Sequence, residues 1–135
     1  MEFQVGQIVS IAKTFTQADF DEFARVSRDD NPIHVDPEFS ARTKFGRTAA
    51  HGMFLYGTIC GLLSQHFSGA VQIEQNLMFP APTFTGEEMK IAAEITAVND
   101  NKGQIHLKTT VTNPSGQLTC DGETVLKWKA GMGHG

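Results

Sequence analysis

The order of hydrophobic and polar residues divides the chain into a first half with helical spacing and a second half with alternating spacing. Loose alternation over residues 7–15 predicts a first strand or an extended arm. Phe20, Phe23 and Ala24 follow at helical spacing and predict a helix that ends near residue 27. Residues 52–67 are apolar on nearly every side, which predicts a helix that is buried on most of its surface but too short to span a membrane.

The spacing changes to a period of two after residue 70. Ile73, Gln75, Leu77 and Phe79 are expected on one face of the first strand in this half. Strands are predicted over residues 71–79, 89–98, 104–112 and 117–128, with turns over 79–88, 99–103 and 113–116. A helix that needs cover on all sides, followed by long antiparallel strands, indicates an α+β fold in which the sheet wraps around the helix. The open edges of a single such sheet favour pairing of two copies into a dimer.

Short polar sequences mark where the other helices begin. Thr16 with Asp19 three residues later is typical of a capping box. Asp36 before Pro37 is typical of an N-cap followed by proline at the first helical position, and it predicts a further short helical segment.

The polar stretch SRDDNPIHVD, residues 27–36, is the main candidate for chemistry. Pro32 has a fixed φ and restricts Asn31, so Asp29 and His34 are expected on either side of a rigid bend instead of on one helix face. Asp29 offers a carboxylate, Asn31 an amide that donates and accepts, and His34 a ring that transfers protons near neutral pH. The alternative is that these residues only cap a turn before proline, and both interpretations stay open on this stretch alone.

The start of the long apolar helix is a second candidate. Gly52 has no Cβ to shield its amide, and the first N–H groups of a helix have no internal partner, which indicates an oxyanion site. The alternative is that Gly52 is a tolerated cap residue. We interpret the adjacent His51 as structural. A metal site built from His34, Asp36 and His51 is also conceivable, although its spacing matches no common ligand pattern.

Three cations, Arg42, Lys44 and Arg47, form a local basic patch. The patch is either a solvated loop or a landing place for a ligand that carries phosphate. Gly57 and Gly61 lie four residues apart in the long helix and predict a smooth groove that a strand or a ligand approaches closely.

Composition limits the classes of function. The net charge is −4, which argues against a nucleic-acid-binding role. Cys60 and Cys120 form no disulfide framework and are interpreted as reduced core thiols, which suits an intracellular protein. The first ten residues lack a signal-peptide pattern, and no apolar run is long enough to span a membrane. We therefore expect one domain over residues 1–135, a cytoplasmic location and no membrane partner.

Three motifs stand in a specific order: Asp29-x-Asn31-Pro32-x-His34-x-Asp36, His51-Gly52-Met53 and Phe79-x-x-Pro82-x-x-x-Gly86-Glu87. Together they resemble the MaoC-like hydratases, which are (R)-specific enoyl-CoA hydratases with a hot-dog fold. The resemblance spans nearly the whole chain. It implies a hot-dog fold, a homodimer with two sheets joined edge to edge, an acyl-CoA substrate, and no metal or redox cofactor.

The resemblance also implies roles for single residues. Asp29 and His34 would bind and activate water, Asn31 would help to hold the site, and Gly52 would give its amide to the thioester oxygen. The expected substrate-binding residues are Arg42, Lys44 and Arg47 near the coenzyme A phosphates, together with Met53 and Tyr56.

Two positions depart from the family pattern. Tyr56 and Cys60 stand where a small or hydroxyl residue is common, which points to short or unusual acyl groups. Two other functions stay open on the sequence: a hot-dog acyl-CoA thioesterase, and a non-catalytic subunit that binds acyl thioesters.

Overall fold

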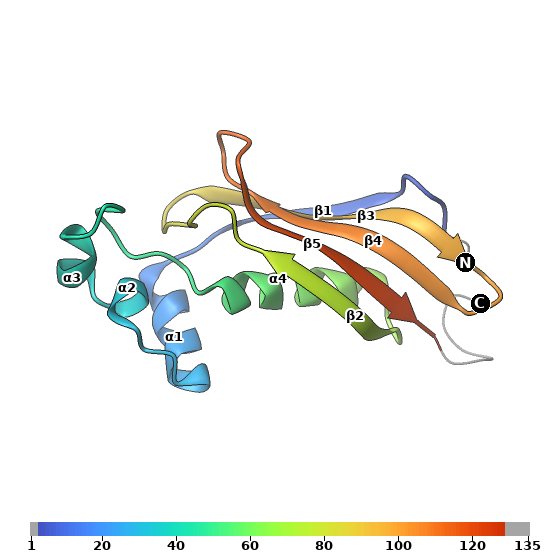
Figure 1. The fold of residues 1–135 in the computed structure, drawn as a ribbon, viewed down its shortest axis with the longest axis horizontal. Helices are drawn as coiled ribbons and strands as arrows, with labels where there is room; N and C mark the ends of the chain where they lie inside the picture. The colour runs from blue at the N-terminus through green and yellow to red at the C-terminus, as the bar shows by residue number, and fades with distance from the viewer. Residues whose placement is uncertain (1–2, 129–135) are drawn as a thin grey trace.

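A computed structural model describes residues 3–128 of the chain (Figure 1). The sequence also predicts a frayed tail over residues 130–135, and this stretch, with His134, lies outside the described residues. The elements are β1 (Ile8–Thr14), α1 (Gln17–Ser27), α2 (Pro32–Val35), α3 (Pro37–Ala41), α4 (Gly52–His66), β2 (Val71–Met78), β3 (Glu88–Asn99), β4 (Gln104–Thr112) and β5 (Leu118–Lys127). Within the described residues, no helix is long and apolar enough to cross a membrane.

The predicted capping sequences start the helices. The Thr16 hydroxyl accepts from the Asp19 N–H at 3.2 Å, and the Thr16 N–H donates to the Asp19 carboxylate at 2.9 Å, which completes the capping box of α1. The Asp36 carboxylate accepts from the N–H of Phe39 at 3.1 Å and caps α3. Both helix starts confirm the prediction.

The segment after Asn31 is helical, where the sequence predicts only a rigid bend. Pro32 is the first residue of the one-turn helix α2, because its missing N–H and fixed φ suit that position. The Asn31 side chain accepts from the Ile33 N–H at 3.3 Å and caps this helix. Asn31 itself is extended, with φ −52° and ψ 131°, as expected before proline.

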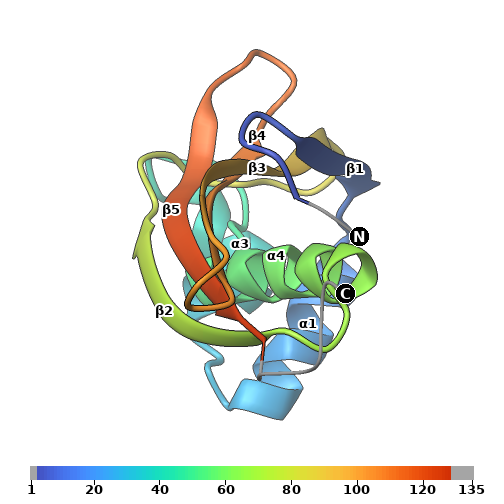
Figure 2. The same cartoon turned by 90° about the vertical axis from the view of Figure 1, so that its right-hand side faces the viewer.

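The five strands form one antiparallel sheet in the order β1-β3-β4-β5-β2. The sheet curves around α4, and α1, α2 and α3 lie together near the first turn of α4 (Figures 1 and 2). The expected arrangement of a sheet wrapped around one helix is confirmed. β1 and β2 are the two edge strands.

One side of α4 packs into the core between helix and sheet. This side consists of Leu55, Ile59, Leu62 and Leu63, all at most 3% exposed. The opposing strands contribute the apolar residues Met89, Ile91, Ile95, Ile105, Leu107, Val111 and Leu126. The core therefore fixes where the start of α4 stands relative to the sheet.

Two expectations about burial are wrong for the single chain. α4 is not buried all round, because Met53 is 53% exposed and Gly57 and Gly61 are also exposed. The alternation of β2 is interrupted by a register shift between Gln72 and Glu74, and Ile73 at this shift is 50% exposed.

Candidate active site

A cavity of about 570 Å³ opens where α4 begins. Its walls come from the α1–α2 loop with α2, from residues 44–55, and from the segment 79–83 that follows β2. Both candidate sites of the sequence analysis contribute to this cavity, since Asp29 and His34 line it together with Gly52. A cavity of this size is typical of small-molecule sites.

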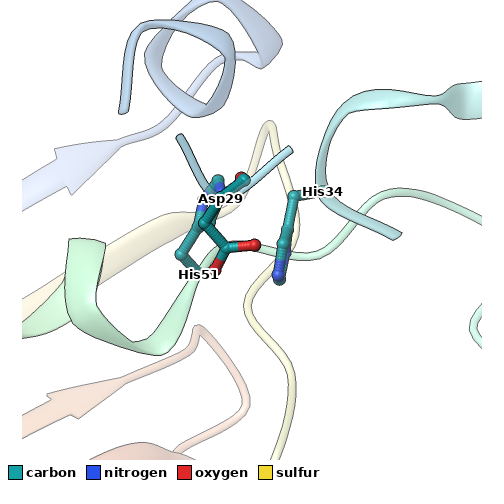
Figure 3. A group of neighbouring side chains, drawn as sticks. All are labelled: Asp29, His34 and His51. Atoms are coloured by element: carbon teal, nitrogen blue, oxygen red, sulfur yellow. The ribbon is translucent and has the colours of Figure 1, made fainter. Parts of the chain in front are cut away.

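Asp29, His34 and His51 form a cluster in the cavity wall. Each offers one polar atom, and these three atoms lie within 4.8 Å of one another. They come from the α1–α2 loop, from α2 and from the residue before α4, and the Asp29 carboxylate extends toward the His34 ring (Figure 3). The fold therefore brings an acid and two imidazoles together across 22 residues of chain.

His34 is held by the backbone next to the long helix. Its Nδ1 lies 2.7 Å from the Ala49 carbonyl, which can only accept, so Nδ1 carries the proton. When the ring is neutral its Nε2 is an acceptor, as a group that binds water needs, and no residue among 3–128 donates to it. The Ala49 N–H also donates to the Ile33 carbonyl at 3.0 Å, so the same residue holds α2 twice.

His51 is 2% exposed and packs flat against His34, with ring centroids 3.9 Å apart and planes at 24°. Its Nε2 donates to the Asp29 carbonyl at 2.7 Å, and its Nδ1 is buried without a hydrogen-bond partner among the described residues. Burial lowers the pKa of His51, and the nearby His34 acts in the same direction. The His51 ring is therefore kept neutral.

Gly52 is the first residue of α4, and its preceding residue makes no side-chain cap bond. The first backbone bonds of the helix come from Phe54 and Leu55 to the His51 carbonyl, so the amides of Gly52 and Met53 precede the helical ladder. A Cβ on Gly52 would stand 2.7–2.9 Å from ring carbons of Phe79. The absent side chain lets the Phe79 ring lie directly against this backbone.

The conceivable metal set of His34, Asp36 and His51 is wrong as stated. Asp36 caps α3, and Asp29 is the carboxylate beside the two rings. Stacked rings direct their in-plane lone pairs along nearly parallel planes, which do not meet at a metal–nitrogen distance of about 2.1 Å. The stack therefore does not form a chelating pair.

The other predicted site residues divide into two groups. Lys44 and Met53 line the cavity and are exposed. Arg42, Arg47 and Tyr56 do not line it. Asn31 does not line it either, and its side chain makes the turn cap that was the alternative interpretation.

Arg47 and Tyr56 have other contacts. The Arg47 guanidinium lies 3.4 Å from the Glu87 carboxylate and 3.9 Å from the centroid of the Phe84 ring. The Tyr56 hydroxyl donates to the Gln72 side chain on β2, and burial, with Cys60 nearby, raises the pKa of Tyr56 to about 12. Their predicted roles toward substrate stay predictions.

Among the cavity-wall residues that sequence reasoning did not assign to the site, Phe79 and Thr83 stand out. Phe79 lines the cavity and is 44% exposed, although it was noted only as part of a motif. Thr83 lines it as well, and its buried hydroxyl has no partner among residues 3–128. No local pattern could have identified Thr83, because its burial depends on how residues 79–83 pack against the segment before α4.

This chain is similar to known proteins over most of its length. The family model described as "MaoC like domain" matches residues 3–116. An (R)-specific enoyl-CoA hydratase of Aeromonas caviae is 38% identical over 92% of this chain and 94% of that protein. A mitochondrial 3-hydroxyacyl-[acyl-carrier-protein] dehydratase of Arabidopsis thaliana is 31% identical over 78% of this chain and 63% of that protein.

A solved structure shares the fold. The (R)-hydratase from Aeromonas caviae superposes with a TM-score of 0.90 at 37% identity, over 94% of this chain and 98% of that one. The α+β architecture, with its five-stranded antiparallel sheet around a central helix, thus matches a hot-dog hydratase structure. The chain belongs to the MaoC-like dehydratase family.

Proposed function

We propose that this protein is an (R)-specific enoyl-CoA hydratase that adds water reversibly to a trans-2-enoyl-CoA to give an (R)-3-hydroxyacyl-CoA. The observation that carries the proposal is the cavity in which Asp29 and His34 stand beside the uncapped start of α4 at Gly52. The relatives named as hydratases and dehydratases of acyl thioesters support the same class of reaction.

The reaction needs a base, a held water and a donor for developing charge. Asp29 takes a proton from a water that also bonds to His34, and the water oxygen attacks C3 of the conjugated thioester. The electron pair of the C2–C3 double bond moves toward the thioester oxygen, where the Gly52 N–H stabilises the charge. The proton that Asp29 took then passes to C2, carried by Nε2 of His34 or by the same water network, so that Asp29 ends the cycle as the carboxylate.

Lys44 and Phe45 define the expected side of entry for the thioester. Both line the cavity and both are exposed, Phe45 at 37%. Lys44 offers a positive charge to the coenzyme A phosphates, and Phe45 an apolar surface beside it. The Arabidopsis relative is named for an acyl-carrier-protein substrate, so the carrier has to be tested as a variable.

We also propose that two copies form a homodimer through the β2 edge. β2 is an edge strand with Val71, Ile73 and Met78 at least 50% exposed. An edge strand with exposed apolar side chains favours pairing with another strand.

The test of function is absorbance of the enoyl-thioester band over a panel of acyl chain lengths, on coenzyme A and on acyl carrier protein, with chiral analysis of the product. Loss of the band with formation of the (R)-3-hydroxy product supports the proposal. Release of free thiol without loss of the double bond would identify a thioesterase instead. Tight binding without either change would identify a non-catalytic binding subunit.

A further inference from the structure

His51 stands at the N-cap position of α4 but does not cap it. N-cap side chains usually accept from the first N–H groups of their helix, and that of His51 makes no such bond. Its ring turns instead toward the α1–α2 loop and is 2% exposed. The hydrogen bond of the His51 side chain is therefore made outside its own helix.

The bond from His51 reaches the peptide of Asp29. The Nε2–H donates to the Asp29 carbonyl at 2.7 Å, between residues 22 apart in sequence. Arg28 precedes Asp29 and has the left-handed backbone conformation with φ 66°, which residues other than glycine rarely adopt. Local bonds from Arg28 to Ala24 and from Asp29 to Ser27 complete the turn. The His51 bond is the contact that ties this turn to the start of α4.

The same ring fixes His34 from one face. The two imidazoles stack at 3.9 Å, while the Ala49 carbonyl holds the edge of the His34 ring at 2.7 Å. Phe23 contacts His51 as well, with ring centroids 4.8 Å apart. His51 is thus packed between the first helix and the imidazole that faces the cavity.

We propose that His51 is the positioning residue of this site, since one side chain both anchors the main chain of Asp29 and supports the ring of His34. The inference rests on the proposed hydratase function and deepens it. His51 touches neither substrate nor water in this role; it acts through the two residues that do.

The charges around His51 agree with this role. The titratable groups of the cavity wall are Asp29, His34 and Lys44. Burial and the neighbouring His34 lower the pKa of His51, which favours the neutral ring that donates through Nε2. A positioning ring that stayed charged would compete with His34 for the Asp29 carboxylate.

Three variants separate positioning from packing. His51→Phe keeps a flat ring against His34 but removes the N–H donor and leaves the Asp29 carbonyl unpaired. His51→Gln restores an N–H at about the reach of Nε2. Phe23→Leu is the matched control, because it loosens packing on the same ring and leaves both hydrogen bonds intact.

The readout is kcat and KM for a short enoyl-CoA, per folded protein. We expect His51→Phe to lose kcat by about 10²-fold, as for a misplaced catalytic group, with KM within about twofold of the parent. His51→Gln is expected to recover at least about tenfold of that loss, and Phe23→Leu to lower the melting temperature while keeping kcat. Parental kcat in folded His51→Phe would overturn the proposal, as would equal loss of kcat in His51→Phe and Phe23→Leu.

A second measurement does not depend on turnover. Long-range ¹H–¹⁵N spectra of the parent are expected to show His51 protonated at Nε2 and His34 at Nδ1, and His51→Phe is expected to shift the backbone signals of Asp29. If His51 instead carried its proton at Nδ1, its Nε2 could not donate to the Asp29 carbonyl, and the proposal would be overturned. If the parent turns over no enoyl thioester, the proposed function fails, and this spectrum alone decides whether His51 holds Asp29.

Discussion

The carboxylate of Asp29 is exposed and accepts no hydrogen bond from residues 3–128. Replacing it by an amide therefore removes a base without removing a structural contact. We expect Asp29→Asn to lower hydration of an enoyl-CoA by about 10²–10⁴-fold, the usual contribution of a general base, with an unchanged melting temperature. Steady-state kinetics and thermal unfolding measure both.

Asp30 provides the matched control for that variant. It is the next residue and is also exposed, but it does not line the cavity. Asp30→Asn is expected to keep parental turnover. Equal losses in the two variants would assign the effect to the charge of the loop and not to the Asp29 carboxylate.

His51 links protonation to stability. Its pKa is lowered below the usual 6.5 by burial, so the unfolded chain takes up a proton at this residue before the folded chain does. The contribution of neutral His51 to the free energy of unfolding is therefore fully present above pH 6.5, and it is lost as the pH falls through the lower pKa of the folded state. Urea unfolding from pH 8 to pH 4.5 is expected to show this loss in the parent and less of it in His51→Gln. An identical slope in both proteins would contradict it.

The joint placement of Asp29 and His34 could be predicted only as a possibility. The proline bend indicated that the two side chains stand near each other, and the cavity contains both. The contacts that hold them come from Ala49 and His51, residues 15 and 22 positions away. Sequence periodicity carries no information on contacts of that separation, which is why His51 was interpreted only as structural.

At the scale of elements, the first turn of α4 has no room for a side chain at position 52, whereas position 57 of the same helix does. A Cβ at position 52 meets the Phe79 ring at 2.7–2.9 Å, whereas a Cβ at position 57 meets nothing within 4 Å. Gly52→Ala is expected to displace Phe79 or the helix start and to cost up to about 2.7–4 kcal/mol of transition-state stabilisation, the usual value of one oxyanion donor.

Gly57→Ala tests the same helix with the opposite expectation. Alanine at this exposed position is expected to stabilise the fold by up to about 1 kcal/mol, the difference in helix propensity, without loss of turnover. Thermal unfolding and kinetics of both variants separate a requirement for glycine at the site from a general effect of glycine in the helix. Full activity in Gly52→Ala would remove the oxyanion role.

Elements with strong local signals were predicted closely, and those set by tertiary packing were not. The capping box placed the start of α1, and the two hairpin turns placed β4 at residues 104–112 as observed. The one-turn helix α2 was missed, because four residues are too few for periodicity. The register shift in β2 was missed as well, since it is defined by the partner strand β5.

For the whole molecule, one chain does not bury α4 on all sides, and it does not cover the β2 edge. Met53 leaves part of an apolar helix open, and Ile73 on the edge strand is 50% exposed. The expectation that α4 is buried all round fails for one chain, but cover from a second copy would account for it.

Ile73→Lys tests this proposal. A charge on a paired edge opposes strand addition, so the parent is expected to sediment with about twice the 14.8 kDa mass of one chain and the variant with the mass of one. Val26→Lys is the control, because Val26 is a 68% exposed apolar residue on α1, away from that edge. A monomeric parent, or a variant that stays dimeric at micromolar concentration, would show that the β2 edge does not join two copies. Turnover in monomeric Ile73→Lys would further show that one chain supplies every group the reaction needs.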